Sequence, residues 1–168
     1  LLPEPFIPFI FLPQINFNMD ATDIKILKLL QCNSRLTYKE IAEKINLTQT
    51  PVFDRIKRME NSGVIDKYVT ILNRKKIDNS LTVFNQVTML KHTVDVSQKF
   101  AEAIALLPEV VECQFVSGGF DYLLKIIVSD MDSYHKFHQL KLSMIPGVSL
   151  MNSYFAVSEI KNTTEIPL

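Results

Sequence analysis

A group of hydrogen-bonding and cationic side chains between residues 48 and 58 has the composition of a surface that reads DNA. Thr50, Asp54 and Lys57 are spaced so that they share one face of a helix, at about 100° per residue. Short polar side chains near the start of such a helix suit base edges in a major groove, and cations suit phosphates. We expect Thr50, Asp54 and Lys57 to set base preference, and Arg58 with flanking Lys to set affinity. The residues that we expect to contact DNA are Thr48, Gln49, Thr50, Phe53, Asp54, Lys57 and Arg58. Arg55 lies nearer the buried flank, so we expect it to form a structural ion pair.

Two helices joined by a tight turn would position these residues, as a helix-turn-helix over residues 38–57. Thr37 and Glu40 have the spacing of a capping box, in which each side chain bonds the other residue's backbone N–H. Asn46-Leu47 predicts the turn, and Thr48 or Thr50 is expected to cap the second helix. The buried stripes are expected to consist of Ile41, Ala42 and Ile45 on the first helix, and of Val52, Ile56 and Met59 on the second.

The same pattern also fits two ordinary amphipathic helices whose polar faces are solvated. Local charge favours DNA, because residues 20–78 contain twelve Lys or Arg against eight Asp or Glu, a formal charge of +4. The whole chain has a net charge of zero, so any affinity for DNA must come from this basic half. Gly63 predicts the end of the second helix, since Gly tolerates a positive φ there.

A second candidate site lies at Gly118-Gly119. A Gly-Gly turn exposes backbone N–H groups that can bind a carboxylate, and Asp121 could face an ammonium. Together they could recognise both ends of an α-amino acid. The alternative is that residues 118–120 form only a hairpin turn, with Asp121 as a turn residue.

Other chemistry has little support in the sequence. His135 and His138 are spaced i, i+3, which is compatible with metal ligation, but no motif supplies a third ligand. No nucleophile elbow, phosphate-binding glycine loop or dinucleotide fingerprint occurs. We therefore expect neither a catalytic site, nor a metal site, nor a cofactor apart from an amino-acid effector.

The rest of the first half predicts one more helix and a strand. Residues 20–33 carry an apolar helical stripe, and Asp20 or Thr22 can cap it. After Gly63, residues 68–72 are rich in β-branched side chains, which predicts a strand. Residues 73–80 are polar and basic and are expected to form a linker between two domains.

The second half predicts strand, helix, strand, strand, helix, strand. The strands are expected at residues 81–90, 110–116, 122–128 and 148–160. The helices are expected to be capped by an Asp95–Gln98 capping box and by Asp132, the latter helix with Phe137, Leu140 and Met144 inward. This βαββαβ order predicts a ferredoxin-like sandwich, so the fold class is α+β. One sheet face would be free of helices, which predicts that subunits pair through their sheets.

Composition limits the remaining possibilities. No apolar run approaches the ~18–20 residues that a membrane-spanning helix needs. Cys32 and Cys113 are far apart, which fits a reducing cytoplasm. Residues 1–18 contain four Pro and four Phe, and we expect an extension outside the fold, with a docking arm for a partner subunit as the alternative. The expected domains are residues 19–72 and 81–168.

These motifs resemble the leucine-responsive/asparagine regulator (Lrp/AsnC) family. The similarity lies in the run MDATDIKILKLL, in RIKRMENSGVI, and downstream in SGGFDYLLKI, IPGV and EIKNTTEIPL. The resemblance implies a winged helix-turn-helix followed by an effector-sensing and oligomerising (RAM) domain. It also implies a cytoplasmic regulator of transcription that binds double-stranded DNA as a homodimer, an octamer or another multiple of dimers. Lys67 stands where the family often has Gly, so the wing geometry is expected to differ.

In the family, the loop corresponding to residues 118–122 faces the last strand of a neighbouring subunit and forms an amino-acid pocket. Carried over, this implies effector contacts from Gly118, Gly119, Asp121 and Tyr122, and from Ser149, Asn152 and Ser153 of the last strand. Met151-Asn152-Ser153 departs from the Thr-rich pattern frequent there, so the effector is not identified. The alternative function is a ferredoxin-like allosteric or accessory protein whose helical domain binds protein and not DNA.

Overall fold

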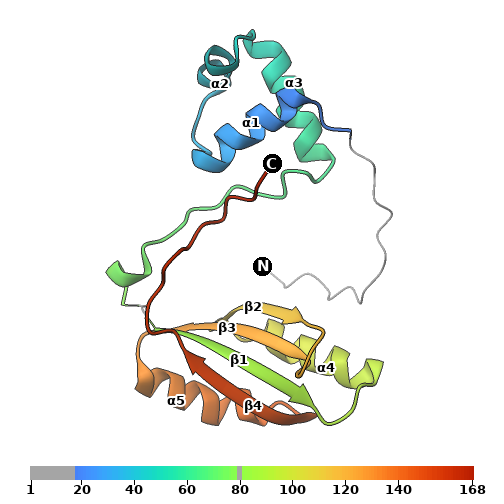
Figure 1. The fold of residues 1–168 in the computed structure, drawn as a ribbon, viewed down its shortest axis with the longest axis vertical. Coiled ribbons are helices and arrows are strands. Elements are labelled where there is room, and N and C mark those ends of the chain that lie inside the picture. The colour runs from blue at the N-terminus through green and yellow to red at the C-terminus, as the bar shows by residue number, and fades with distance from the viewer. Residues whose placement is uncertain (1–17, 79–80) are drawn as a thin grey trace. The chain divides into compact units, whose positions relative to one another are not determined.

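The computed structural model describes residues 18–78 and 81–168, and the chain divides into two units (Figure 1). The helical unit comprises the described residues up to Ile71 together with Ile160–Leu168. The sandwich unit spans Leu72–Glu159. This division differs from the predicted domain boundary, which placed residues 160–168 with the sandwich. The extension predicted for residues 1–18 lies outside the described residues, except for Asn18.

The helical unit contains α1 (Ala21–Cys32), α2 (Tyr38–Ile45) and α3 (Gln49–Asn61). Capping boxes begin the first two helices: Asp20 pairs with Asp23, and Thr37 pairs with Glu40 as predicted. The three helices share one core, because each contributes apolar side chains at helical spacing. Its buried members are Ile26, Leu27, Ile41, Ala42, Val52, Ile56 and Met59, which confirms the stripes predicted for α2 and α3, except that Ile45 is only half-buried.

The turn between α2 and α3 depends on Asn46, whose φ of 57° is left-handed, a conformation that Asn tolerates. Thr48 occupies the N-cap position of α3, but its side chain makes no capping hydrogen bond. Gly63 follows the end of α3 with φ 75°, so the predicted role of this glycine is confirmed.

The strand predicted at residues 68–72 is wrong, because this segment has no strand partner in the described structure. Residues 66–72 run on from α3 without regular hydrogen bonding, and Val69, Ile71 and Leu72 are exposed. β-Branched side chains favour an extended backbone, but a strand also needs a neighbour.

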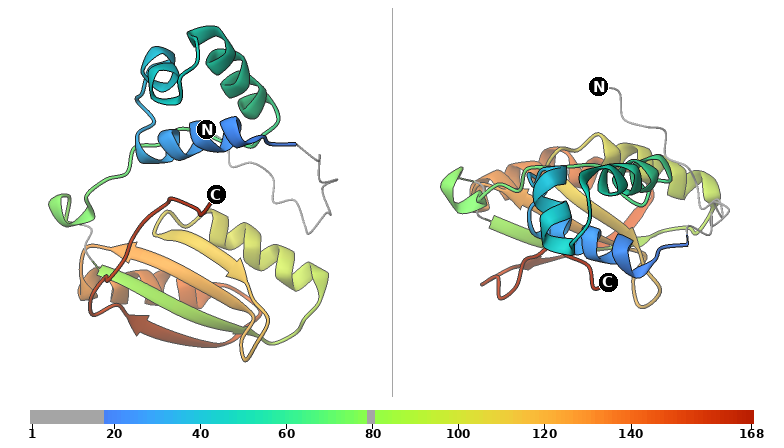
Figure 2. Two further views of the ribbon diagram at one scale, coloured as in Figure 1. Left: turned by 45° about the horizontal axis from the view of Figure 1, so that its top comes forward. Right: turned by 90° about the horizontal axis from the view of Figure 1, so that it is seen from above.

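The sandwich unit confirms the predicted βαββαβ order. After a short 3-10 turn, η1 (Arg74–Lys76), its elements are β1 (Leu81–Met89), α4 (Val94–Ala105), β2 (Val110–Phe115), β3 (Tyr122–Val128), α5 (Met131–Leu140), the 3-10 turn η2 (Leu142–Met144) and β4 (Val148–Phe155). The strands form one antiparallel sheet in the order β2-β3-β1-β4. Both helices pack on the same face of this sheet (Figures 1 and 2).

Alternation along the strands separates a packed face from an open face. Val83 and Val87 of β1, with Leu124 and Ile126 of β3, point into the core beneath α4 and α5. The open face carries the alternate residues, namely Thr82, Phe84, Gln86, Thr88, Leu123, Lys125, Ile127, Leu150, Asn152 and Tyr154, and its edge residues Leu150 and Tyr154 are about half exposed.

The ends of the helices differ from the predictions. Thr93, and not Asp95, is the N-cap of α4, and Asp95 instead pairs with Lys99 inside the first turns. Asp130 caps α5 through the backbone N–H of Ser133, two residues before the predicted Asp132. The end of α5 also differs, because Leu140 and Met144 were predicted to point inward. The helix ends at Leu140, and these two residues are 74% and 73% exposed. Leu142 of η2 fills the core instead. β4 ends at Phe155, earlier than predicted.

Candidate nucleic-acid interface and effector site

The residues predicted to contact DNA all lie on the exposed side of α3 or at its N-cap. Thr48, Gln49 and Thr50 are exposed at the start of the helix, and Asp54 lies one turn later. Because the cap of α3 has no side-chain bond, the first-turn N–H groups stay available for an external acceptor such as a phosphate. Phe53 is 40% exposed and stacks edge-on against Tyr38 of α2, at 5.3 Å between ring centroids. This part of α3 combines uncharged hydrogen-bonding groups with one carboxylate and one aromatic ring.

The cations of α3 are held by carboxylates. Arg55 Nη1 lies 2.6 Å from Asp20 Oδ2 and 2.8 Å from Asp23 Oδ1, which confirms the ion pair predicted for Arg55. Arg58 Nη2 lies 2.7 Å from Asp23 Oδ2. Asp23 raises the pKa of Arg55, and Asp20 adds to this effect. Arg58 was predicted to set DNA affinity, but its guanidinium is also bound to α1, so it carries a structural task as well.

Asp23 is the residue of this region that the sequence analysis missed. It is fully buried, and its carboxylate joins α1 to α3 through both arginines. A buried carboxylate without partners would be unfavourable by several kcal/mol, so the two guanidinium groups are what makes this position tolerable. The signal in the sequence was an acidic residue on the apolar stripe of α1, three positions after the cap.

Lys57 is half exposed and forms an i, i+3 ion pair with Glu60, with its Nζ 2.7 Å from Glu60 Oε2. This pair raises the pKa of Lys57 and lowers that of Glu60. Glu60 also accepts a hydrogen bond from the Tyr68 hydroxyl at 3.0 Å. Burial, with a contribution from Glu60, raises the pKa of Tyr68 to about 12. Tyr68, predicted as a strand residue, therefore ties the segment after α3 back to that helix.

In the sandwich, Gly118 and Gly119 are exposed in the hairpin between β2 and β3, and the φ of Gly118 is 151°. Asp121 closes this hairpin. Its Oδ2 accepts the backbone N–H of Met89 at 2.7 Å, and its Oδ1 lies 3.3 Å from His92 Nδ1. Asp121 thus already bonds the end of β1 through Oδ2. Its other oxygen, Oδ1, faces the exposed side chain of His92.

Tyr122 is placed differently from the effector contact that was predicted. Its ring is buried against Phe100 and Phe115, with centroid distances of 4.5 and 5.3 Å. Tyr122 faces the helices because it begins the inward row of β3, with Leu124 next in that row. Tyr122 therefore supports the hairpin from the side of the sheet that the helices cover.

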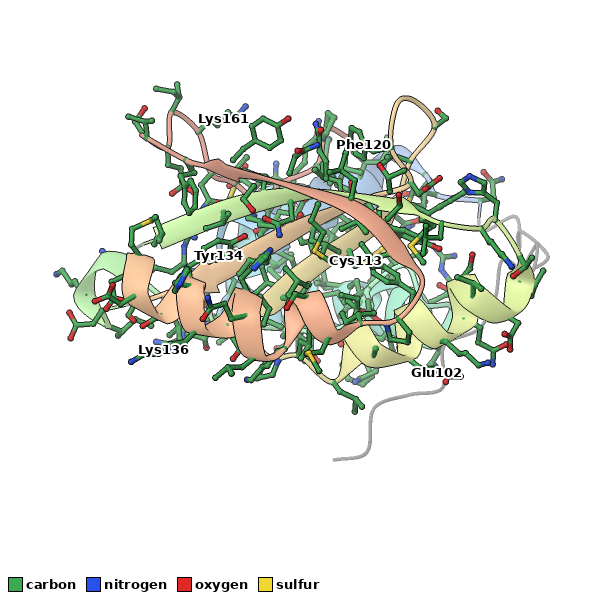
Figure 3. The ribbon with its side chains drawn as sticks, turned by 90° about the horizontal axis from the view of Figure 1, so that it is seen from below. Glu102, Cys113, Phe120, Tyr134, Lys136 and Lys161 are labelled. Atoms are coloured by element: carbon green, nitrogen blue, oxygen red, sulfur yellow. The ribbon has the colours of Figure 1, made fainter. Side chains whose placement is uncertain are left out.

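Two of the three candidates on β4 lie on opposite faces of the sheet, and the third, Ser149, is exposed near the start of the strand. Asn152 pairs with Gln86 on the open face and is exposed, whereas Ser153 pairs with Asn85 and points toward α5. Tyr134 belongs to α5 (Figure 3). Its hydroxyl lies 2.6 Å from Ser153 Oγ and donates to Asn85 Oδ1 at 3.0 Å. Asn85 and Tyr134 were not predicted, and Asn85 Nδ2 is buried with no partner among the described residues.

The chain does not bring the hairpin and β4 into contact. Tyr122 pairs with Val87, and Val87 pairs with Met151, so β1 separates the two groups of candidates. Both groups lie toward the same end of the sheet, where Leu90 N–H donates to the Gly147 carbonyl at 2.8 Å. A pocket that uses the exposed members of both groups would need a second copy of the chain.

Both units are similar to known protein domains. A sequence model of the Lrp/AsnC ligand binding domain matches residues 82–166, and a winged helix-turn-helix DNA-binding model matches residues 19–66. The chain belongs to the Lrp/AsnC family. The leucine-responsive regulatory protein of Haemophilus influenzae is 40% identical to it over 153 residues, which cover 91% of this chain and 92% of that protein.

Two solved structures of the family are similar throughout. A transcriptional regulator of Neisseria meningitidis, solved as a complex with L-Met, is 35% identical with a TM-score of 0.85, and the match covers 89% of this chain and 97% of that chain. An AsnC family regulator of Agrobacterium tumefaciens is 38% identical with the same TM-score and the same coverage. As a member of the Lrp/AsnC family, this chain is a DNA-binding transcriptional regulator with a ligand-binding domain.

These relatives are named as regulators, which supports the prediction that this Lrp/AsnC protein is not an enzyme and disfavours an accessory protein whose helical unit binds protein. Within residues 18–78 and 81–168, no group of three or more His, Cys, Asp or Glu side chains is arranged to hold a metal ion. No helix in the same part of the chain is long and apolar enough to cross a membrane.

Proposed function

We propose that this regulator recognises its DNA site with the N-terminal half of α3, which presents Gln49, Thr50 and Asp54, while Lys57 and Arg58 add affinity for phosphates. The observation that carries this proposal is the separation of α3 into two sides. Val52, Ile56 and Met59 are buried, and every candidate contact lies on the exposed side or at the cap. Because the cations are partly neutralised by Asp23 and Glu60, we expect uncharged groups to supply most of the sequence preference.

A selection from random duplexes, followed by fluorescence anisotropy on the selected site, tests this proposal. Gln49→Ala/Thr50→Ala should weaken binding to the selected site by about 1–3 kcal/mol and leave binding to random DNA nearly unchanged. Lys57→Ala should weaken both equally and lower the slope of log affinity against log salt by about one. Glu43→Ala, an exposed change on α2, is the control. Equal affinity of the double variant and the wild type for the selected site would assign recognition to another surface.

We also propose that the sandwich binds an amino acid, between the 117–121 hairpin of one copy and β4 of a second copy. The ligand-binding domain match and the L-Met complex of the Neisseria relative support this class of ligand. The exposed candidates are Gly118 and Gly119 on the hairpin, with Ser149 and Asn152 on β4. Tyr122 and Ser153 would not contact the ligand directly but would support the exposed candidates, since both side chains point toward the helices.

A thermal-shift screen of the twenty amino acids would identify the effector, because a ligand of the folded state stabilises it by RT ln(1 + [L]/Kd). Asp121→Asn is the decisive variant, since an amide oxygen can still accept the Met89 N–H while the negative charge is lost. We expect it to melt close to the wild type and to lose the shift. Asp132→Asn, at an exposed position of α5, is the control. An undiminished shift in Asp121→Asn would place the ammonium elsewhere.

The open face of the sheet supports a further proposal, that the functional unit is a dimer paired through its sheets. Phe84, Leu123 and Ile127 lie at the centre of this face, with Leu150 and Tyr154 toward β4. An apolar sheet face needs a cover. Leu150→Glu/Tyr154→Glu should therefore produce monomers in light scattering. Val94→Glu, at an apolar and still more exposed position on α4, should not. Dimers in both variants would contradict pairing through this face.

A further inference from the structure

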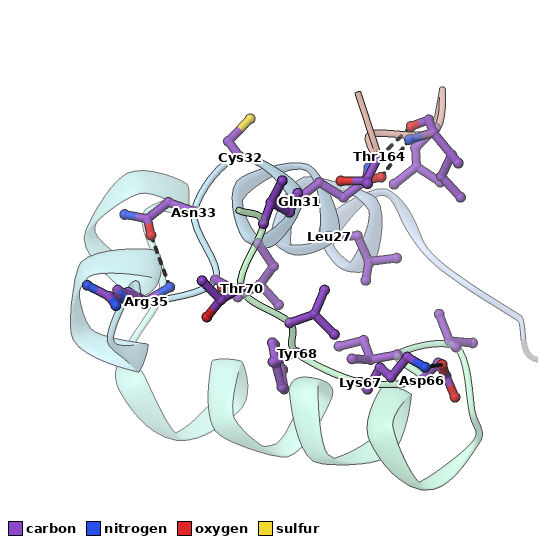
Figure 4. Close-up of a pocket in the computed structure, with 18 of the residues that line it drawn as sticks. Leu27, Gln31, Cys32, Asn33, Arg35, Asp66, Lys67, Tyr68, Thr70 and Thr164 are labelled. Atoms are coloured by element: carbon purple, nitrogen blue, oxygen red, sulfur yellow. Dashed lines mark hydrogen bonds and ion pairs between the residues drawn. The ribbon is translucent and has the colours of Figure 1, made fainter. Parts of the chain in front are cut away.

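The side chain of Gln31 on α1 holds the last residues of the chain. Gln31 Oε1 accepts the backbone N–H of Ile166 at 2.7 Å, and Gln31 Nε2 donates to the Ile166 carbonyl at 3.2 Å (Figure 4). An amide group that both accepts from and donates to one residue reproduces the bonds that a neighbouring strand would make. Gln31 thus binds the backbone of an extended segment, whatever side chain that segment carries.

The tail, defined as residues 163–168, is suited to this contact by its own sequence. Pro167 restricts the preceding Ile166 to an extended conformation and has no N–H that would need a partner. Thr163 Oγ1 accepts the backbone N–H of Glu165 at 3.1 Å, which orders the approach to Ile166. Both features reduce the conformational entropy that is lost when the tail docks.

The tail borders a cavity of about 600 Å³ without filling it. α1 lines this cavity with Leu27 (Figure 4) and with Leu30. The segment after α3 lines it with Val69 and Ile71. Ile166 remains 65% exposed and Leu168 37% exposed. Two hydrogen bonds and little apolar burial are characteristic of a segment that opens locally long before the protein unfolds.

We propose that the tail is an exchangeable peptide ligand of the helical unit and that Gln31 is the residue that binds it; we call this contact the C-terminal latch. Its occupant is this chain's own tail, which is seated there. The tail follows β4 in the chain, and residues 160–168 belong to the helical unit on which the tail docks. The latch needs neither DNA nor an amino acid, so it is independent of the function proposed above.

Solvent exchange of the Ile166 amide, measured by NMR on the full chain, tests the latch. In the wild type this amide should exchange more slowly than in a free peptide of the tail sequence. Gln31→Ala should accelerate the exchange about tenfold, the effect expected from losing hydrogen bonds of ordinary net strength. Gln31→Glu, which keeps an acceptor but sets a carboxylate against the Ile166 carbonyl, should fall between the two. Lys28→Ala, an exposed change on the same helix, should have no effect.

A double-variant cycle separates the latch from general loosening of α1. Ile166→Pro removes the N–H that Gln31 accepts, and the order of the tail can then be followed through the backbone dynamics of Leu168. Gln31→Ala and Ile166→Pro should each increase the mobility of Leu168. The double variant should be no more mobile than Gln31→Ala alone, because Gln31→Ala already removes both hydrogen bonds. The latch is refuted if the wild-type Ile166 amide exchanges as in the free peptide, or if the two substitutions add.

Discussion

The exposed side of α3 and the hairpin end of the sandwich collect their candidate residues in different ways. On α3, Gln49, Thr50 and Asp54 come from one helix and share a surface because of helical geometry alone. In the sandwich, Gly118 and Asn152 come from elements that β1 keeps apart, and Tyr122 and Ser153 point away from both toward the helices. The proposed DNA-reading surface is therefore local, whereas the proposed effector site would use a second chain.

The two regions also use charge differently. The helical unit places the fully buried carboxylate of Asp23 between two arginines of α3, so the position of α3 depends on ion pairs. The core of the sandwich is held by apolar side chains and by the uncharged Asn85–Tyr134–Ser153 group. This contrast implies that changes in charge disturb the helical unit first and that changes in shape disturb the sandwich first.

The largest effect is expected from Asp23→Ala. This substitution removes the carboxylate that joins both arginines of α3 to α1 and leaves a small cavity. Arg55 keeps its pair with Asp20 and both arginines are partly exposed, which limits the loss. We expect the free energy of unfolding of the helical unit to fall by about 3 kcal/mol. Hydrogen exchange of α1 and α3 would measure this loss, with the sandwich strands as an internal reference. Asp54→Ala, at an exposed position of α3, should lower the free energy of unfolding only slightly. An equal loss from both variants would show that Asp23 does not stabilise the packing of α1 on α3.

A change of shape in the sandwich should come next. Gly147 has φ 86°, and a Cβ built there would lie 2.8 Å from Val96 Cγ1, so Gly147→Ala combines backbone strain with a clash. We expect a loss of about 2–3 kcal/mol in urea unfolding. Gly63→Ala is the matched control, since φ is 75° there but no atom lies within 4 Å, and it should cost only about 1 kcal/mol. An equal loss of stability at both positions would mean that backbone strain explains the effect without the clash against Val96.

Most of the fold could be predicted because its signals are local. The Thr37–Glu40 capping box, the Val52–Ile56–Met59 stripe and the turn at Gly63 each depend on residues a few positions apart. The βαββαβ order followed from alternation and turn residues in the same way. Caps were less certain, because Asp95 and Asp132 stand close to the true caps, Thr93 and Asp130, and the residue that caps is decided by where the chain enters the helix.

What could not be predicted depends on contacts between distant residues. Nothing near Asp23 in the sequence indicates that Arg55 and Arg58 will reach it. The same holds for Tyr134, which meets Asn85 and Ser153 only after α5 packs on the sheet. The segment 68–72 was predicted as a strand from its composition, but composition does not supply a partner strand. Among the effector candidates, Gly118, Gly119 and Asp121 could be named from the chemistry of the turn. Tyr122 and the three β4 residues could be named only through family resemblance, since β1 separates β4 from the hairpin.

The smallest effect expected is a difference in how the two units respond to acid. Three carboxyl groups of the helical unit have lowered pKa values: Asp20 through the backbone N–H of Asp23 and then Arg55, Glu40 through the backbone N–H of Thr37, and Glu60 through Lys57. In the sandwich, the pKa of Asp130 is lowered by the backbone N–H of Ser133. A carboxyl whose pKa is lower in the folded state stabilises the fold above its ordinary pKa, 3.8 for Asp and 4.5 for Glu, and this contribution disappears as the pH falls further.

Below about pH 4.5, therefore, the helical unit should lose stability before the sandwich does. Amide protection factors at pH 6, 4.5 and 3 would follow α1 and α2 against β1 and β3. Glu40→Gln removes one of the titrating groups, so it should reduce the difference between pH 6 and pH 3 for α2 while lowering its protection at pH 6. Because these carboxylates are mostly exposed and screened, the effect should also shrink at high salt. Earlier loss of protection in β1 and β3 would show that the ionic contrast between the two units does not govern their stability.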